Sequence, residues 1–480
     1  MNKRLLCHLV GNVVRVCGAL MALPVIVSLI LRSGDTLPLL LSMLIAMAVG
    51  TALALIQPRR DTLRAREGFA IVAFSWIIVS FLGGLPFYFS GYVPSLVDCF
   101  FETVSGFTTT GATILTDVEA LPKGLLFWRS FTHWAGGMGV LVLSLALIPK
   151  MGARSIHLMR AESPGPSTDK LVPRVANNAK ILYEIYVAIS LFMVAALLFC
   201  GMDLYDALVH MFGAAGTGGF GTYADSIAHF NSAAVDIVVG VFMALFGVNF
   251  SIYYFLIRRN WKAAFGNSEL RWYLGILLSV SCIIAVNIMP MYGGNFFTSL
   301  RYSFFQCSSI MTTTGYATAD FDLWPQLSRV LLVTLMFIGA SAGSTGGGLK
   351  VVRVQLLLKS MVRDIRRTVH PKSVNTVKLD GHTVDESILS GVQGFFFAYF
   401  LILILATVVV SLDGFSFETN FTAVVATLSN IGPGLGMVGP TGNFAAFSDV
   451  SKIVLSLCML IGRLEIFPVL MLVSPSAWRK

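Results

Sequence analysis

The chain has 480 residues, of which 56% are hydrophobic and only 12% are charged, whereas a soluble protein carries roughly 25% charged residues. A soluble core cannot absorb this much apolar surface, so the composition excludes a soluble protein and indicates an integral membrane protein. The net charge of +9 would suit nucleic acid, but the basic residues follow the membrane topology, which argues against a nucleic-acid partner.

Ten apolar runs are long enough to be predicted as membrane spans, which need about 20 residues. The first two runs, Leu9–Leu31 and Leu37–Ile56, are separated only by Arg32 to Thr36 and predict a hairpin. The other eight form four pairs: Gly68–Ser90 with Leu125–Ile148, Ile181–Gly201 with Ala233–Ile257, Trp272–Pro290 with Ser328–Lys359, and Leu389–Leu412 with Lys452–Val473.

The charged residues between the spans are sorted by sign. Basic residues gather around positions 59–66, 150–180, 258–262, 350–378 and 479–480. The opposite loops are expected to carry the acidic residues Asp98, Glu102, Asp117, Glu119, Asp203, Asp206, Asp225, Asp320, Asp322, Asp413, Glu418 and Asp449. Because positive residues favour the cytoplasmic side, both termini are predicted to be cytoplasmic.

A short apolar segment followed by a glycine-containing loop recurs between the two spans of every pair. The short segments are Ser95–Phe107, Asp203–Phe212, Phe296–Ile310 and Phe417–Leu428. The glycines of the loops, Gly111, Gly219, Gly315 and Gly432, stand 108, 96 and 117 residues apart. Repetition at this scale predicts related structural units, here 67–176, 177–266, 267–383 and 384–480 after an N-terminal hairpin at 1–66.

Apolar segments of ten to fifteen residues are better interpreted as re-entrant helices than as spans. Irregular backbone at membrane depth is tolerated only where it is buried in protein or lines a water-filled path. Four loops that converge would offer rings of carbonyls to a monovalent cation, and the loop residues fit no obvious helix cap. The predicted ion-binding residues are Thr110, Gly111, Gly218, Gly219, Thr314, Gly315, Ile431 and Gly432. The alternative is that Gly and Thr merely permit close helix packing.

The second span of the third unit is interrupted by the glycine-rich sequence from Gly339 to Lys350, which will not sustain a helix. A phosphate-binding loop would need Lys directly after its second glycine, and Leu349 intervenes. A flexible loop at this depth can act as a gate, whereas the alternative is a static helix break. The predicted gate residues are Gly343, Ser344, Thr345, Gly346, Gly347, Gly348, Lys350 and Arg463.

Arg463 is predicted to lie midway along the last span, where an arginine is costly and indicates a function. Facing a pore, its charge would form a barrier to cations; the alternative, an ion pair with Glu465, is disfavoured because residues two apart point to different faces of a helix. His133 is interpreted as an interfacial packing residue rather than a ligand, and Asn249 as a hydrogen-bond partner of a neighbouring helix or of the glycine-rich loop.

Three motifs resemble those of the TrkH/TrkG/KtrB superfamily of potassium transporters: Gly-Phe-Thr-Thr-Thr-Gly-Ala (106–112), Ala-Gly-Ser-Thr-Gly-Gly-Gly-Leu-Lys (342–350) and Gly-Arg-Leu-Glu-Ile-Phe-Pro (462–468). The resemblance spans the chain, and the N-terminal hairpin is similar to the TrkH/TrkG branch. It implies an all-α integral membrane protein, with four membrane–pore-loop–membrane repeats around a pseudo-fourfold pore. The family's filter glycines would fall on the four loop glycines, although Gly218 and Ile431 stand where the pattern has threonine.

The resemblance also implies the function, which is potassium uptake across the bacterial inner membrane and not enzymatic catalysis. K⁺ would be the transported ion, and no nucleotide would bind to this chain. The expected partners are a second copy in a homodimer, a cytosolic nucleotide-binding regulatory subunit of the TrkA type, and membrane lipids. The alternative function is a secondary potassium symporter coupled to H⁺ or Na⁺.

Overall fold

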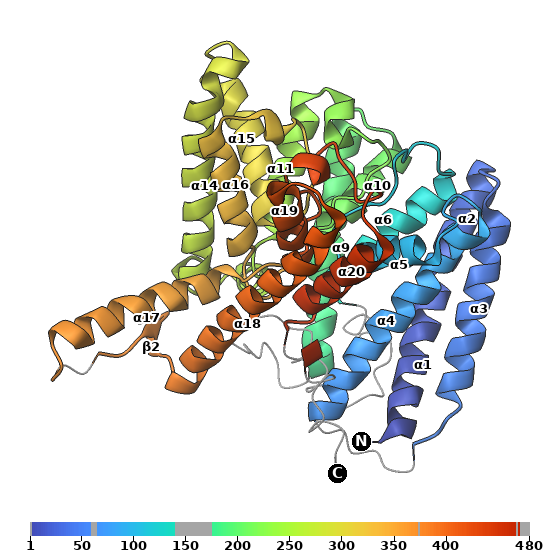
Figure 1. Ribbon diagram of the computed structural model, residues 1–480, viewed down its shortest axis with the longest axis horizontal. Helices are drawn as coiled ribbons and strands as arrows, with labels where there is room; N and C mark the ends of the chain where they lie inside the picture. Colours follow the sequence, from blue (N-terminus) through green and yellow to red (C-terminus); the bar gives the residue numbers. More distant parts are fainter. Residues whose placement is uncertain (1, 59–64, 140–174, 373–374, 467–468, 471–480) are drawn as a thin grey trace.

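The computed structural model describes residues 2–58, 65–139, 175–372, 375–466 and 469–470 (Figure 1). This part of the chain is mostly helical, with one two-stranded antiparallel hairpin, β1 (Lys378–Leu379) and β2 (His382–Thr383). The α-helices are α1 (Lys3–Leu20), α2 (Ala22–Leu31), α3 (Thr36–Ala54), α4 (Ala65–Phe89), α5 (Leu96–Phe107), α6 (Lys123–Gly137), α9 (Val175–Phe199), α10 (Leu204–Gly216), α11 (Ala233–Phe246), α12 (Phe250–Ile257), α13 (Trp261–Gly266), α14 (Ser268–Ile288), α15 (Phe296–Met311), α16 (Gln326–Ile338), α17 (Val351–Val369), α18 (Glu386–Val410), α19 (Phe417–Leu428) and α20 (Asp449–Arg463). The 3₁₀ turns are η2 (Ser226–Phe230), η3 (Met289–Tyr292), η4 (Phe321–Leu323), η5 (Ser411–Asp413) and η6 (Gly436–Val438).

Six helical stretches in the described residues are long and apolar enough to cross a membrane, fewer than the ten predicted spans. They are Lys3–Leu31, Thr36–Ala54, Glu67–Phe89, Lys180–Phe199, Ser268–Tyr292 and Glu386–Asp413. These six correspond to the N-terminal hairpin and to the first predicted span of each pair. Their exposed side chains, such as Phe192 and Phe397, are large and apolar, as expected where lipid is the solvent.

The second span of each predicted pair is short, broken or only partly described. The helices α16 and α20 have only 13 and 15 residues, and the interruption predicted in the third unit is confirmed, because α16 ends at Ile338 and α17 begins at Val351. The structure describes the second span of the first pair, Leu125–Ile148, only through its first part in α6. Residues 140–148, most of the basic segment 150–180 and the C-terminal residues 471–480 lie outside the described residues.

The predicted span Ala233–Ile257 is not a straight helix. The segment is divided into α11 and α12, which meet at an angle of 92°. The glycine-rich segment from Gly339 to Lys350 supplies backbone partners at the bend: Ser341 N–H donates to Gly247 O at 3.1 Å, and Phe250 N–H donates to Gly343 O at 3.0 Å. Because these bonds satisfy backbone groups that the helix no longer pairs, the break is tolerated at membrane depth.

The short helices α5, α10 and α19 lie toward the middle of the molecule in Figure 1. The helices α1 to α4 form one side, and α14 to α16 form the opposite side, with α19 and α20 between them. Of the last ten residues of α19, from Thr419 to Leu428, all but Phe421 are buried. Helix α17 and the start of α18 project from this body (Figure 1).

Candidate functional site

The C-terminal ends of the four short helices share one backbone motif. In each loop, the residue two positions before the glycine donates its N–H to the carbonyl of the residue three positions before itself. The residue directly before the glycine donates its N–H to the carbonyl of the residue five positions before itself. The three-residue hydrogen bonds run from the N–H to the carbonyl oxygen of these pairs: Thr109 to Gly106, Thr217 to Ala214 and Thr313 to Ile310, with N–O distances of 3.1 Å each, and Asn430 to Thr427 at 3.3 Å. The five-residue hydrogen bonds run from Thr110 to Ser105 at 2.9 Å, and from Gly218 to Gly213, Thr314 to Ser309 and Ile431 to Ala426 at 2.8 Å each. This pair of bonds is the Schellman closure of a helix, so the expectation that the loop residues form no cap was wrong.

Every loop has left-handed backbone at the same two positions. The first is the residue two positions before the loop glycine, with φ of 55° at Thr109, 56° at Thr217, 59° at Thr313 and 58° at Asn430. The second is the loop glycine, with φ of 83° at Gly111, 77° at Gly219, 89° at Gly315 and 96° at Gly432. Left-handed backbone costs a residue with a side chain about 1–2 kcal/mol. Strain of this kind persists only where the surrounding structure holds it, and it concentrates at functional sites.

The four loops contact one another in a closed cyclic order. A Cβ added at Gly111 would lie 1.9 Å from Gly218 O, and one added at Gly219 would lie 2.2 Å from Thr314 O. A Cβ added at Gly315 would lie 2.3 Å from Ile431 O, and one added at Gly432 would lie 2.7 Å from Thr110 O, which closes the cycle. Each glycine therefore lies directly against the carbonyl that precedes the next glycine. The structure thus brings together all eight residues predicted to bind the ion; the binding itself stays a prediction.

The loops differ in how their side chains support the backbone. In the first and third loops, two threonine hydroxyls bond to each other, Thr108 to Thr110 at 2.8 Å and Thr312 to Thr314 at 2.7 Å. The fourth loop has no such pair, because Ile431 stands at the second position. Instead, the Asn430 side-chain amide donates to the Thr110 hydroxyl at 2.9 Å. The fourth loop therefore depends on contacts outside its own sequence.

Behind the second loop lies His133, which was predicted to be an interfacial packing residue and is fully buried. Its Nδ1 is 2.7 Å from Gly106 O, and its ring lies 4.1 Å from that of Phe220. A Cβ at Gly218 would come within 2.4 Å of the imidazole. His133 thus explains why a glycine stands where the other loops have Thr or Ile.

A buried ion pair that the sequence did not reveal joins the first and second loops. Glu102 was predicted in an acidic loop, but it lies inside α5 and is 1% exposed. Arg129 Nε donates to Glu102 Oε1 at 2.7 Å, and the other carboxylate oxygen accepts from Ile114 N–H at 2.9 Å. The Arg129 guanidinium also lies 3.5 Å from the ring centre of Phe220. The pair therefore fixes the backbone just beyond two of the loop glycines.

Residues of the predicted site line two cavities. One, of about 80 Å³, is lined by all four loop glycines and by Arg129. The other, of about 90 Å³, is lined by residues of the glycine-rich loop and by Lys350, Arg463 and Glu465. All predicted gate residues except Thr345 therefore line a cavity different from the one that the four loop glycines line.

The glycine-rich loop lies directly against the third and fourth loops. Gly347 N–H donates to the Thr313 hydroxyl at 2.6 Å. Added Cβ atoms at Gly346 and Gly347 would lie 2.8 Å from Thr312 O and 2.4 Å from Ser429 O. Glycine is therefore required here by close approach, and a movement of this segment must be felt at the helix ends that carry the loops.

The glycine-rich loop is also held at its two ends. Asn249 caps α12 by accepting from Ser251 N–H at 2.9 Å, and its side chain lies 3.0 Å from a Cβ added at Gly343. At the other end, Lys350 has a left-handed backbone with φ of 77°, and its ammonium group donates to Gly346 O. Asn249 therefore packs against the glycine-rich loop, although its hydrogen bond is to the helix that it caps.

Arg463 is the last residue of α20, so the prediction that it lies midway along a span was wrong. The chain then turns through Glu465, which has a φ of 59°. Arg463 Nη1 donates to Thr345 O at 2.8 Å, and Nη2 donates to Gly136 O and Gly137 O at 2.6 Å each. Glu465 accepts from Arg353. Arg463 therefore joins the glycine-rich loop to the end of α6.

Comparisons with known proteins give matches over the whole chain. Residues 39–480 match the family model described as TrkH, cation transport protein. The chain is 39% identical to the Trk system potassium uptake protein TrkH of Salmonella typhimurium, over all of both chains, and 33% identical to TrkG of Escherichia coli, over 100% of this chain and 99% of that one. The crystal structure of the potassium transporter TrkH from Vibrio parahaemolyticus superposes with a TM-score of 0.89 at 33% identity, covering all of both chains.

Proposed function

This chain belongs to the TrkH family of cation transport proteins, and we propose that it takes up potassium through a single pore formed by the four glycine loops. The observation that carries the proposal is the cyclic contact of Gly111, Gly219, Gly315 and Gly432 with the carbonyls of the neighbouring loops. Carbonyl oxygens held in this way can replace the hydration shell of a monovalent cation. The C-terminal ends of four helices add negative dipole character at the same place.

The proposed architecture is an N-terminal hairpin at 1–66 and four pore repeats at 67–176, 177–266, 267–383 and 384–480. It is supported by the same pair of Schellman hydrogen bonds at the C-terminal ends of α5, α10, α15 and α19. The six long apolar helices fit a multi-pass protein of the bacterial inner membrane, with both termini on the cytoplasmic side. In this arrangement the ion ligands are Thr110, Gly111, Gly218, Gly219, Thr314, Gly315, Ile431 and Gly432.

Gating is proposed to occur by movement of the loop Gly343–Gly348. Its contact with Thr313 and its bond from Arg463 hold it beside the ring of loops. Arg463 and Lys350 add positive charge to the cavity that this loop lines, which opposes the passage of a cation. Release of the Arg463 contact would therefore both free the loop and change the electrostatic barrier.

The proposed partners are a second copy of the chain and a cytosolic nucleotide-binding subunit of the TrkA type. Helix α17 supports a protein partner, because it projects from the body of the molecule and exposes the apolar residues Leu358, Met361, Val362, Ile365 and Val369. Large exposed apolar rows mark lipid or protein contacts. Nucleotide control would then act on the gate through the partner.

The test is ion flux through the purified protein in proteoliposomes and planar bilayers. Passive, potassium-selective current that reverses at the potassium equilibrium potential supports the pore. Uptake that stops when proton and sodium gradients are abolished supports the symporter instead. A variant shortened within Gly343–Gly348 is measured in parallel, so that a closed gate is not mistaken for an inactive protein; absence of potassium flux in both would refute the proposal.

A further inference from the structure

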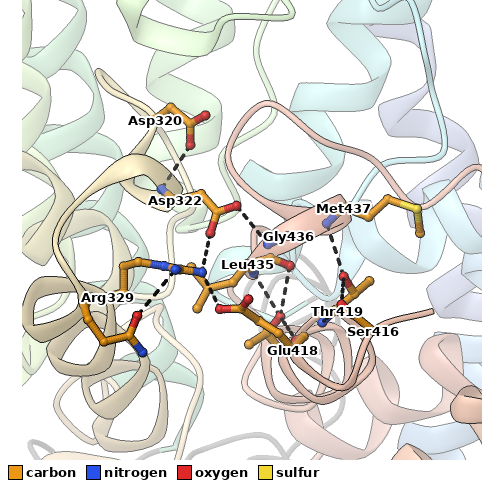
Figure 2. A network of polar contacts seen from close by, with 11 residues as sticks. Asp320, Asp322, Arg329, Ser416, Glu418, Thr419, Leu435, Gly436 and Met437 are labelled. Atoms are coloured by element: carbon orange, nitrogen blue, oxygen red, sulfur yellow. Dashed lines mark hydrogen bonds and ion pairs between the residues drawn. The ribbon is translucent and has the colours of Figure 1, made fainter.

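Resting on the proposed function, we propose that Asp322 is a positioning residue that sets the place of the fourth filter loop and thereby the preference for potassium. The contacts are drawn in Figure 2. Asp322 belongs to the turn η4 before α16, whereas the fourth loop follows α19. Asp322 and the fourth loop therefore belong to different units, and the residues in contact, Asp322 and Gly436, stand 114 positions apart in the sequence.

The carboxylate of Asp322 accepts one hydrogen bond with each oxygen. Its Oδ2 accepts from Gly436 N–H at 3.1 Å, four residues beyond the loop glycine Gly432. Its Oδ1 accepts from Arg329 Nη2 at 2.9 Å, and the same nitrogen also donates to Glu418 (Figure 2). Arg329 therefore orients Asp322 toward the fourth loop and joins it to the helix α19 that ends in that loop.

The fourth loop has a particular need for such support, because it has no pair of threonine hydroxyls and has a proline at position 433. Its backbone beyond Gly432 is held by Thr422, whose hydroxyl accepts from Leu435 N–H at 2.9 Å, and by Thr419, whose hydroxyl accepts from Met437 N–H at 3.3 Å. Both threonines belong to α19. Asp322 joins this stretch to the third unit through its bond from Gly436 N–H, so it sets the fourth loop relative to its neighbour in the ring.

The same chemistry occurs at the first loop, which is an independent argument. There Glu102 accepts from Ile114 N–H, three residues beyond Gly111, and is held by Arg129. In both places an arginine of the following helix fixes a carboxylate that accepts a backbone N–H just beyond a filter glycine. A hydrogen bond to a charged group is stronger than one between neutral groups, which suits it to holding a strained backbone.

Three isosteric variants separate positioning from a simple effect of charge. Asp322→Asn, Asp320→Asn and Glu418→Gln each remove one negative charge from this cluster. Asparagine at 322 replaces one of the two accepting oxygens by an NH₂ group, which donates and cannot accept from either Arg329 or Gly436. Glutamine at 418 still accepts from Arg329, and asparagine at 320 still accepts from Asp322 N–H, its contact at 3.0 Å. Only the first variant is expected to release the fourth loop.

The measurements are the ratio of potassium to sodium uptake by the full-length protein in proteoliposomes, and hydrogen exchange of the peptide covering 431–438. Asp322→Asn should lower the uptake ratio about fivefold to tenfold and speed the exchange, and the other two variants should change neither. Equal loss of selectivity in all three would show that charge attracts the cation and would overturn the proposal. Parental selectivity and parental exchange in Asp322→Asn would overturn it as well.

The two readouts also distinguish failure of the inference from failure of the proposed function. If the parent protein shows no potassium preference, the proposed function fails. Hydrogen exchange then still decides whether Asp322 positions the fourth loop, since faster exchange in Asp322→Asn than in Glu418→Gln does not depend on transport.

Discussion

Replacement of Gly315 by serine tests the ring of loops most directly. Gly315 has a φ of 89°, and an added Cβ would lie 2.3 Å from Ile431 O and 2.9 Å from Pro433 Cδ. Real Cβ atoms essentially never approach another heavy atom within 3.0 Å. The carbonyl of Ile431, or the third loop itself, must therefore move away by about 0.7 Å, the difference between the 3.0 Å limit and the 2.3 Å from the added Cβ to Ile431 O.

The energetic consequence has two parts. The left-handed backbone costs the serine about 1–2 kcal/mol of stability, and the displaced carbonyl weakens one ligand of the ion. An interaction between a polar group and a charge contributes about 1.5–3 kcal/mol, and 1.4 kcal/mol corresponds to about a factor of ten. Gly315→Ser should therefore reduce the preference for potassium over sodium about tenfold.

The assay is potassium and sodium uptake into proteoliposomes, normalised to folded protein. Gly294→Ser is the matched control, because Gly294 also has a left-handed backbone, with φ of 74°, but an added Cβ would meet nothing within 4 Å. The control bears the backbone cost without the collision and should keep the parental selectivity. A folded Gly315→Ser protein with unchanged selectivity would refute the argument that Gly315 lies at the ion path.

Three further outcomes are expected. A deletion within Gly343–Gly348 should raise basal potassium flux and weaken dependence on a cytosolic partner; a folded variant that conducts no more than the parent would place the gate elsewhere. Arg463→Ala should raise the uptake rate at saturating potassium per folded protein, because it frees Thr345 O and removes a positive charge; a lower normalised rate with a lower unfolding temperature would instead assign a structural role. Glu102→Ala should destabilise the protein by about 3–5 kcal/mol, because it leaves Arg129 buried and unpaired, and replacing both residues by apolar ones should recover part of that loss in a denaturation experiment; equal stability of the single variant and the parent would contradict this.

The amino-acid sequence by itself determined the membrane environment and the repeated pattern around the loops. These features are local: apolar runs, short segments and glycines can be recognised in windows of a few to 20 residues. The interruption after Ile338 could be predicted for the same reason, because five glycines between Gly339 and Gly348 weaken a helix wherever they occur. The eight proposed ion ligands were likewise found from the recurrence of the loop.

The tertiary structure decided the features that depend on distant backbone groups. The bend between α11 and α12 exists because the glycine-rich loop, about a hundred residues later, supplies hydrogen-bond partners there. The apolar composition of 233–257 is equally suitable for a straight span. The end of α20 and the contacts of Arg463 were missed for the same reason, since the carbonyls that Arg463 binds belong to α6 and to the glycine-rich loop.

The buried charges illustrate the same division. Glu102 and Asp322 are ordinary acidic residues in the sequence, and the sign of their charge predicted only the side of the membrane. Their partners, Arg129 and Arg329, stand 27 and 7 residues away, and the backbone groups that they hold are assigned only when the loops are packed together. The sequence determined which segments enter the site because hydrophobicity and backbone propensity act locally. Packing decided which polar groups face one another, because a desolvated charge or backbone N–H must find its partner wherever the fold brings one within reach.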